Sequence, residues 1–350
     1  MKDGKVYEEG EKVIDLLPKC ETFFEITKTD ICRLGAFVNC YLYDENGFEV
    51  ASCQLDMCAE IEKLVKSDKN VEFFEDEHNY KISAGGNTYT FSKHLGEITS
   101  LIKNEDEMLC DNIRLTVMRA PIDNERRIRD QFYKEYLKWE AEGFDRIYNK
   151  CYEVKRDGNK LVVSGSLSAV GRLPFLRYSA GYSFYEDGSC KIELSGDVRE
   201  DVIWLPRLGF EIKTPSKYNK FSYFGRGKEE NYIDMHYHTK KGFYESDAES
   251  EYVNYIYPQE HGNHTGAKEL KMENGIFFSA DKEFEFNVSR YSALSLMKAE
   301  HIDELEKDEN VIIRIDYKNS GVGSASCGPQ LLEKYRLCEK RIDGFEFFIS

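Results

Sequence analysis

Tyr178-Ser-Ala-Gly-Tyr-Ser-Phe-Tyr-Glu-Asp-Gly-Ser-Cys-Lys-Ile-Glu-Leu-Ser195 is the stretch that displays the building unit of the fold most clearly. Its two ends, Tyr178–Tyr185 and Lys191–Ser195, are short runs with many aromatic and aliphatic residues, which favour strands. Glu186-Asp-Gly188 between them is a turn signal. The stretch therefore predicts two antiparallel strands joined by a tight turn.

The same pattern recurs along the chain. Further strand-like runs are Ala36–Tyr43, Phe48–Leu55, Lys160–Ser166, Phe284–Ser289 and Val311–Tyr317. Turn signals lie at Asp44-Glu-Asn-Gly47, Asp157-Gly158 and Asn274-Gly275. Many short strands joined by tight turns predict an all-β chain of antiparallel sheets packed as a sandwich. The pattern lacks the helical segments between successive strands that a parallel α/β fold requires.

One segment, 125–141, has helical spacing. Its apolar positions are Ile128, Phe132, Tyr136 and Trp139. Gly143 stands where a glycine that ends a helix is expected. The opposite side is charged, so we expect a helix packed on a sheet with that side in solvent.

Composition limits the classes of partner. The chain has 350 residues, enough for one large or two smaller domains, and a formal net charge of −16. Nucleic acid and anionic membrane both attract positive surfaces, so neither is an expected partner. A neutral or cationic ligand, or a protein, fits the charge better.

The sequence predicts a cytoplasmic chain. No apolar run approaches the roughly 20 residues that cross a bilayer. The polar start at Met1 lacks the apolar core of a signal peptide and is expected for a naturally short chain. The ten cysteines are scattered without a Cys-x-x-Cys pair, which favours reduced thiols over a disulfide framework.

The N-terminal part is predicted to be an incomplete domain. Residues 59–70 are charged and lack a strand pattern, so we expect a linker there between residues 1–58 and residues 71–350. The first part holds only three or four predicted strands, whereas an immunoglobulin-like sandwich has about seven. Unpaired strand edges invite association, which is a physical reason to expect a second chain.

Two groups of polar residues could form a metal or catalytic site. Glu229, Glu230 and Asp234 follow Gly225-Arg-Gly227, and we expect these acids to accept from backbone N–H groups and to pair with Arg226. The histidines are His236, His238, His261 and His264. A metal needs three or four convergent ligands, so satisfied polar roles are expected and no metal is assigned to this chain.

Gly321-Val-Gly-Ser-Ala-Ser-Cys-Gly-Pro329 is the segment with the strongest functional signal. Three glycines and a proline predict unusual backbone angles, suited to the close approach of a ligand. An ordinary strand connection is the alternative.

Six blocks resemble the small-chain domain of lactase-type β-galactosidases (glycoside hydrolase family 2), in the family's order. They are Arg119-Ala-Pro-Ile-Asp-Asn124, Leu205-Pro-Arg-Leu-Gly209, Tyr223-Phe-Gly-Arg-Gly-Lys-Glu-Glu-Asn-Tyr-Ile-Asp234, Tyr257-Pro-Gln-Glu-His-Gly-Asn-His-Thr265, Phe284–Ser292 and Gly321–Pro329. Glu125, Lys228 and Met235 depart from the family's Asp, Pro and Arg. Gly47-Phe-Glu-Val-Ala-Ser-Cys-Gln54 more weakly resembles the preceding immunoglobulin-like domain.

The resemblance implies a large antiparallel supersandwich of the galactose-mutarotase type, preceded by a partial immunoglobulin-like β-sandwich. It also implies a partner: a large chain whose (β/α)₈ barrel carries both catalytic glutamates and is expected to hold Mg²⁺ and Na⁺. The family's acid/base glutamate follows an asparagine. The Asn-Glu pairs here, Asn104-Glu105 and Asn124-Glu125, lie in a charged turn and in a small-chain block, so no catalytic residue is expected in this chain.

By resemblance, the tip of the Gly321–Pro329 loop forms one wall of a galactoside pocket. The expected substrate-binding residues are Ser324, Ser326, Cys327 and Gly328. Ala325 stands where an asparagine is frequent, which removes a hydrogen-bonding group.

The leading hypothesis is the small subunit, or C-terminal part, of a hetero-oligomeric β-galactosidase that hydrolyses terminal β-D-galactosides such as lactose, with the isolated chain inactive. A non-catalytic carbohydrate-binding or assembly protein is the first alternative. An aldose-1-epimerase-like enzyme is the second. It would need a histidine and a glutamate in the central cleft of the supersandwich, and no motif indicates them.

Overall fold

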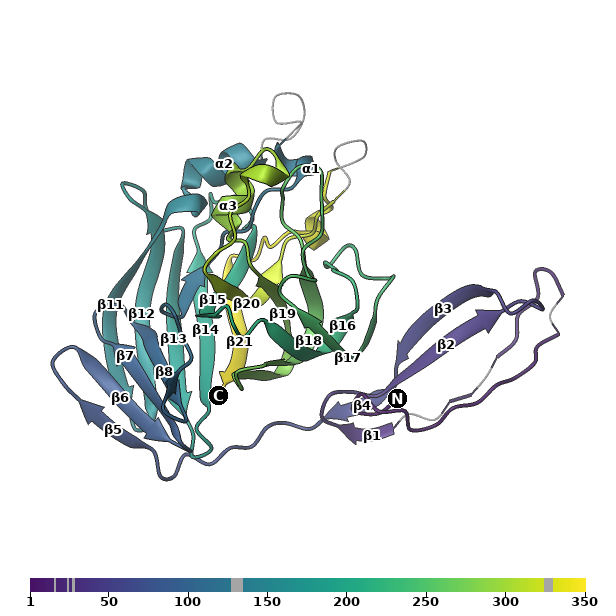
Figure 1. The fold of residues 1–350 in the computed structure, drawn as a ribbon, viewed down its shortest axis with the longest axis horizontal. Coiled ribbons are helices and arrows are strands. Elements are labelled where there is room, and N and C mark those ends of the chain that lie inside the picture. The colour runs from purple at the N-terminus through teal and green to yellow at the C-terminus, as the bar shows by residue number, and fades with distance from the viewer. Residues whose placement is uncertain (16, 24, 27–28, 127–134, 324–329) are drawn as a thin grey trace.

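The computed structural model describes residues 1–350 except 16, 24, 27–28, 127–134 and 324–329. The body of the molecule is built on a 12-stranded sheet whose pairings are all antiparallel (Figure 1). Its strands are β10 (Arg114–Thr116), β11 (Ile147–Asp157), β12 (Lys160–Ala169), β13 (Leu176–Phe184), β14 (Cys190–Val198), β15 (Arg207–Pro215), β16 (Lys220–Gly227), β17 (Lys240–Asp247), β18 (Asn263–Met272), β19 (Phe277–Ser289), β20 (Asn310–Asn319) and β21 (Arg341–Ile349).

The strand order of this sheet is β10-β15-β20-β19-β21-β14-β13-β12-β11. Strand β18 also pairs with β19, β16 pairs with β18, and β17 pairs with β16. The predicted hairpin is confirmed: β13 and β14 pair with Tyr182 opposite Ile192, and Gly188 in the turn has a φ of 81°. A residue with a β-carbon is strained at such an angle, which explains the glycine.

A five-stranded antiparallel sheet forms a second layer. Its strands are β5 (Glu72–Glu75), β6 (Asn79–Ala84), β7 (Asn87–Ser92), β8 (Glu97–Lys103) and β9 (Asp106–Glu107). The layers meet through edge-to-face ring pairs, Phe91 with Tyr182 at 4.9 Å and Tyr89 with Phe184 at 5.3 Å between centroids. One hydrophobic core runs through both sheets, so the all-β, antiparallel supersandwich prediction is confirmed.

The α-helices within the described residues are α1 (Asp123–Arg126), α2 (Glu135–Glu142) and α3 (Ala293–Lys298). The predicted helix 125–141 corresponds to the end of α1 and to α2, while 127–134 lie outside the described residues. Its predicted end is confirmed, because Gly143 has a φ of 79° and its N–H donates to Trp139 O at 3.0 Å. Trp139 is buried, and its indole N–H donates to Trp204 O at 3.2 Å.

Four strands at the N-terminus form an arm that extends away from the body (Figure 1). They are β1 (Thr29–Cys32), β2 (Phe37–Tyr43), β3 (Glu49–Asp56) and β4 (Cys58–Ile61). β2 and β3 form an antiparallel hairpin, and β1 pairs with β4 in parallel. Strand β4 reaches into the segment predicted as linker, of which 62–70 carry no helix or strand.

The arm touches the body at several places, which include an ion pair of Arg33 with Glu269 and a hydrogen bond from Lys240 Nζ to Ser52 Oγ. Leu34, Phe37 and Phe224 form a hydrophobic cluster separate from the main core. The side-chain amide of Gln54 donates to Lys241 O and accepts from Lys241 N, both at 2.8 Å, so it bonds the backbone of edge strand β17.

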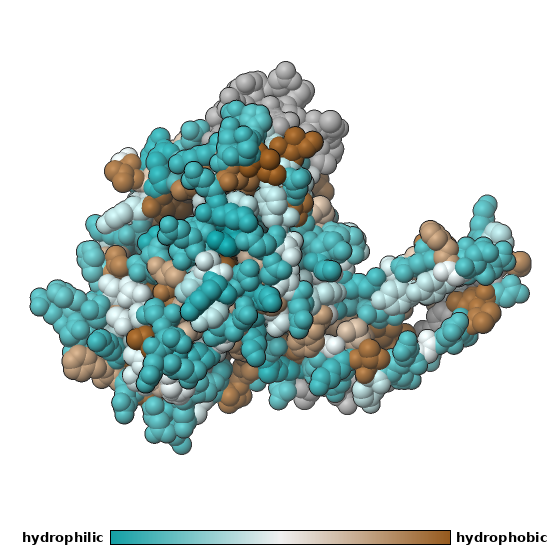
Figure 2. Space-filling model, in the orientation of Figure 1, coloured by the Kyte–Doolittle hydropathy of each residue, from teal (hydrophilic) through white to brown (hydrophobic). Residues whose placement is uncertain are grey.

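The opposite side of the β2–β3 hairpin is apolar and open. Side chains alternate along strands, so the neighbours of Gln54 and Tyr41 face the other way. This outer face consists of Val38, Cys40, Leu42, Ala51, Cys53 and Leu55. Leu42 and Leu55 are 50% and 48% exposed, and Figure 2 shows hydrophobic surface on the arm.

Among the described residues, no helix is both long and apolar enough to span a lipid bilayer.

Candidate functional site

Arg119 lies in the first of the six sequence blocks and forms hydrogen bonds with two others. It is fully buried between β10 and α1, and its guanidinium donates to Glu125 through Nη2–Oε1 at 2.7 Å and Nη1–Oε2 at 3.1 Å. It also donates to Pro206 O at 3.3 Å and to Gly321 O at 3.4 Å. Burial lowers the pKa of Arg119, but the charges of Glu125 and Glu260 outweigh it, so the pKa is raised and the side chain stays a cation.

Glu260 forms a second buried ion pair beside it. Arg314 Nη2 donates to Glu260 Oε1 at 2.8 Å and Nη1 donates to Oε2 at 3.2 Å. Burial raises the pKa of Glu260, but the cations Arg314 and Arg119 outweigh it and hold that pKa below its usual value. Glu260 is therefore a charged structural acceptor that also receives Ala120 N–H.

Asp234 and Asn124 hold the start of the glycine-rich loop. The Asp234 carboxylate accepts from Val322 N at 3.0 Å and from Gly323 N at 2.7 Å. From the other side, the Asn124 amide donates to Val322 O and Gly323 O, each at 2.9 Å. Both backbone faces of this segment are bonded, so its position is fixed by side chains from two distant blocks.

The sequence-predicted binding residues Ser324, Ser326, Cys327 and Gly328 lie outside the described residues. The structure describes the first three residues of the loop, Gly321–Gly323, which we call the loop root.

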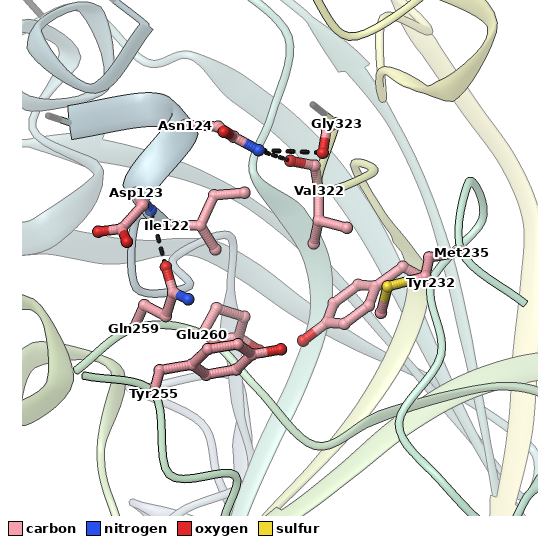
Figure 3. Close-up of a pocket in the computed structure, with 10 residues that line it drawn as sticks. All are labelled: Ile122, Asp123, Asn124, Tyr232, Met235, Tyr255, Gln259, Glu260, Val322 and Gly323. Atoms are coloured by element: carbon pink, nitrogen blue, oxygen red, sulfur yellow. Dashed lines mark hydrogen bonds between the residues drawn. The ribbon is translucent and has the colours of Figure 1, made fainter. Parts of the chain in front are cut away.

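A hollow of about 160 Å³ opens beside the loop root (Figure 3). Its lining comes from four blocks and two residues just outside them, Met235 and Tyr255. The block residues are Ile122, Asp123, Asn124, Tyr232, Gln259, Glu260, Val322 and Gly323. The hydroxyls of Tyr232 and Tyr255 point towards each other across it in Figure 3. The buried Tyr232 hydroxyl has no hydrogen-bond partner among the described residues, whereas the Tyr255 hydroxyl donates to Glu230. The wall of the hollow is thus aromatic and polar.

The acidic cluster after Gly227 has part of the structural role expected of it, through Glu230 and Asp234. Glu230 accepts from Gly262 N at 2.7 Å, and Asp234 accepts from the loop root. The expected partner Arg226 instead donates to Thr239 O at 3.4 Å. These acids therefore order loops rather than form a catalytic pair.

The four histidines contact separate partners. His236 and His238 lie within hydrogen-bonding distance of Tyr232 O and Glu230 O, and His261 of Gln259 O. His264 is fully buried, with Nε2 2.8 Å from Glu251 Oε2. No group of three or more His, Cys, Asp or Glu side chains within the described part of the chain is placed to hold a metal ion.

The sequence did not identify Glu285, the acid with the most unusual environment. It lies on β19 and accepts from Asn263 Nδ2 at 3.0 Å and Asn319 Nδ2 at 3.2 Å. Burial, assisted by the negative charge of nearby Asp316, raises its pKa to about 7. Glu285 belongs to the Phe284–Ser292 block, but nothing in the spacing of that block marks a buried acid.

Of the two acids among the described residues that line the hollow, Asp123 and Glu260, Glu260 is held in an ion pair. A retaining glycosidase needs two carboxylates about 5–5.5 Å apart that are able to reach substrate. Both oxygens of Glu260 are bound to Arg314, and the amide of Gln259 accepts from Asp123 N at 2.7 Å.

Comparison with known proteins identifies the family to which the sequence blocks around the loop root belong. A family model described as "Beta galactosidase small chain" matches residues 83–349. The chain belongs to this β-galactosidase small-chain family. The resemblance predicted from the six blocks is therefore confirmed.

Curated relatives of this small chain are whole β-galactosidases. The enzyme of Actinobacillus pleuropneumoniae is 31% identical over 84% of this chain and 29% of its own length. That of Staphylococcus xylosus is 27% identical over 75% of this chain and 27% of its own length. The small chain thus spans less than a third of each relative.

Among solved structures, a putative aldose 1-epimerase of Escherichia coli K12 aligns with 80% of the small chain and 98% of its own chain. Sequence identity is 10% and the TM-score is 0.38, a likeness too distant to support a conclusion about function.

Proposed function

We propose that this chain is the small subunit, or the C-terminal part, of a β-galactosidase that hydrolyses terminal non-reducing β-D-galactose residues of lactose-type substrates. A partner chain holds the barrel and both catalytic glutamates. The observation that carries the proposal is the meeting of distant family blocks at the loop root, through Arg119, Asn124 and Asp234.

The role of this chain is to position. Asp234 and Asn124 fix where the Gly321–Pro329 loop begins, and Ser324, Ser326, Cys327 and Gly328 form one wall of the galactoside pocket. Misplacing a substrate wall by about 1 Å can cost on the order of 100-fold in rate. We expect the isolated chain to be inactive because the catalytic glutamates lie in the partner, and the Glu260 carboxylate at its own hollow is bound to Arg314.

The arm supplies a surface for the large chain. Two two-stranded sheets bury little core of their own, and such small sheets are marginally stable in water. The outer face of the β2–β3 hairpin carries half-exposed Leu42 and Leu55. Strands of the partner that complete an immunoglobulin-like sandwich would cover this face and make the enzyme a hetero-oligomer.

The remaining features follow from this division of roles. Mg²⁺ and Na⁺ are proposed for the partner barrel, and the enzyme is proposed to act in the cytoplasm. The formal charge of −16 supports a neutral sugar as ligand and gives no attraction to nucleic acid or an anionic membrane.

Reconstitution tests the proposal. The chain is co-expressed with the barrel-bearing product of a neighbouring gene, co-purified and assayed with lactose and a chromogenic β-galactoside. Activity is expected from the pair and from neither chain alone. Hydrolysis by the isolated chain would overturn the assignment of cleavage to the partner.

A carbohydrate-binding protein without catalytic partner is the second candidate, favoured by the hollow and its buried Tyr232 hydroxyl. Calorimetric titration of the isolated chain with galactose separates the two: saturable binding without reconstituted activity supports the second candidate. The aldose-1-epimerase alternative is not better supported than the β-galactosidase proposal, since no motif in the sequence indicates the histidine and glutamate that it needs. An anomeric-proton exchange assay checks it.

A further inference from the structure

Two cysteines face each other across the β2–β3 hairpin. Cys40 on β2 lies directly opposite Cys53 on β3 in the register of the strands. Directly opposed residues of antiparallel strands point to the same side, with β-carbons about 4.5–5.5 Å apart. Disulfides join residues whose α-carbons are about 4.4–6.8 Å apart, a range that includes both kinds of opposed pair. Their β-carbons are about 3.5–4.5 Å apart, so the two strands have to close slightly for the bond to form.

The environment of the pair suits reaction with a dissolved disulfide. The Cys53 side chain is exposed and Cys40 is half-buried, and the structure records no disulfide between them. Burial, the neighbouring Cys53 charge and a Cys53 hydrogen bond raise the pKa of Cys40. Cys40 is therefore the poorer first nucleophile, and its thiol contacts the Cys53 side chain.

We propose that Cys40 and Cys53 form a reversible oxidation site, in which a low-molecular-weight disulfide such as oxidised glutathione converts the two thiols into a cross-strand disulfide. The Cys53 thiolate attacks one sulfur of the reagent, and the first glutathione thiolate leaves. The Cys40 thiolate then attacks Cys53 Sγ, and the second glutathione leaves. The two cysteines are oxidised, the reagent is reduced to two thiols, and each cysteine releases one proton to water or to a departing thiolate.

A disulfide between Cys40 and Cys53 would restrict the opening of the β2–β3 hairpin. The hairpin has only two strands and meets the body only along its inner face, through Phe37, Ser52 and Gln54, so it opens more readily than the core. A disulfide between its strands removes freedom from the opened state. The disulfide lies on the outer face that the proposed partner covers, so it forms in the chain before assembly, while Cys53 is exposed. In a reducing compartment the pair stays as thiols, and the link forms when the glutathione pool becomes oxidised.

The test uses the full-length isolated chain, equilibrated with a series of reduced and oxidised glutathione ratios and then alkylated. Chymotryptic digestion separates the cysteines, because Tyr43 and Phe48 lie between Cys40 and Cys53, and Leu55 lies between Cys53 and Cys58. Mass spectrometry should find Cys40 linked to Cys53 in the wild type. The link should also form in Cys20→Ser, a control that removes an exposed cysteine elsewhere in the N-terminal segment.

Two further measurements test the order in which the two cysteines react and the effect of the disulfide on the hairpin. In Cys40→Ser, Cys53 should accumulate as the mixed disulfide with glutathione, because no thiol is left opposite it. Hydrogen exchange of the β2 and β3 amides should slow by about tenfold or more in the oxidised wild type and stay unchanged in Cys53→Ser. Separate glutathione adducts on Cys40 and Cys53 in the wild type, or no more linkage in the native chain than in urea, would overturn the proposal.

Discussion

Asp234 lies so close to Gly321 that a β-carbon added at Gly321 would stand 2.5 Å from Asp234 Oδ1. The two residues are 87 positions apart in sequence, yet the carboxylate occupies the space that a side chain at Gly321 would need. This contact lets Asp234 reach the two N–H groups that follow in the chain. Position 321 therefore requires a glycine because of the Asp234 carboxylate, independently of any ligand that approaches the loop.

Gly321→Ala should displace the loop root. The new methyl group and Asp234 cannot both keep their positions, and overpacking of this kind costs about 1–3 kcal/mol. We expect reconstituted galactosidase activity to fall by roughly 100-fold, since the loop is misplaced while the core stays folded. The control is Gly10→Ala, where nothing lies within 4 Å of the added carbon. Equal activity in the two variants would contradict the role given to the loop root.

Asp234→Asn should loosen the loop root without unfolding the protein. An amide is neutral and has one acceptor oxygen, so one of the two backbone N–H groups loses its acceptor, at a cost of about 1–3 kcal/mol, and the other keeps an uncharged one. Hydrogen exchange at Val322 and Gly323 should become faster. This measurement needs no partner chain, and unchanged exchange at both amides would show that the carboxylate does not hold them.

Arg314→Met should destabilise the whole body. It leaves Glu260 buried without its cation, which typically costs about 3–5 kcal/mol. Urea unfolding should show the loss, and the double variant with Glu260→Gln should recover part of it. Lys155→Met removes an exposed pair with Glu153 and should cost less than about 1 kcal/mol.

Glu285 should make stability fall as pH rises. Its folded pKa of about 7 lies above its usual value of 4.5, so the folded state binds the proton more tightly over this window. Its favourable contribution is fully present below pH 4.5 and is lost as pH rises through 7, a change of up to about 3 kcal/mol. Glu285→Gln should flatten the profile of unfolding free energy between these values. Exposed Glu273→Gln should keep the wild-type slope, and parallel slopes in all three proteins would rule Glu285 out.

Leu42→Ser with Leu55→Ser should impair assembly. Both side chains are about half exposed in this chain, so its own stability should change by less than about 0.5 kcal/mol per site. Their burial by a partner would be lost, which should weaken association by about tenfold or more. Sedimentation or co-purification with the large chain measures this, with exposed Val170→Ser as the control. Unchanged affinity would show that the outer face is not part of the interface with the large chain.

Local signals predicted the strands well and the site only in part. The run Lys191–Ser195 and the turn at Gly188 depend on neighbours in sequence, so composition suffices. The contact between Asn124 and Val322 depends on the packing of whole sheets, and no spacing encodes it. The sequence blocks indicated that these segments matter together, but not that Asp234 would hold the loop root.

Two features of the structure could not be predicted from the sequence, for similar reasons. The parallel pairing of β1 with β4 joins segments separated by a complete hairpin, so no local alternation reveals it. Glu285 looks like an ordinary strand acid in sequence, and only the surrounding sheets bury it beside Asp316. Burial of this kind is a property of the assembled layers.

The paired hydrogen bonds between Gln54 and Lys241 have a consequence for solubility. Strand β17 lies at the margin of the large sheet, where an unsatisfied N–H and C=O would recruit strands from other molecules. One glutamine amide engages both groups of Lys241 and acts as a cap on that margin. A chain that loses the arm to proteolysis would therefore keep its fold and gain a tendency to form fibrous aggregates.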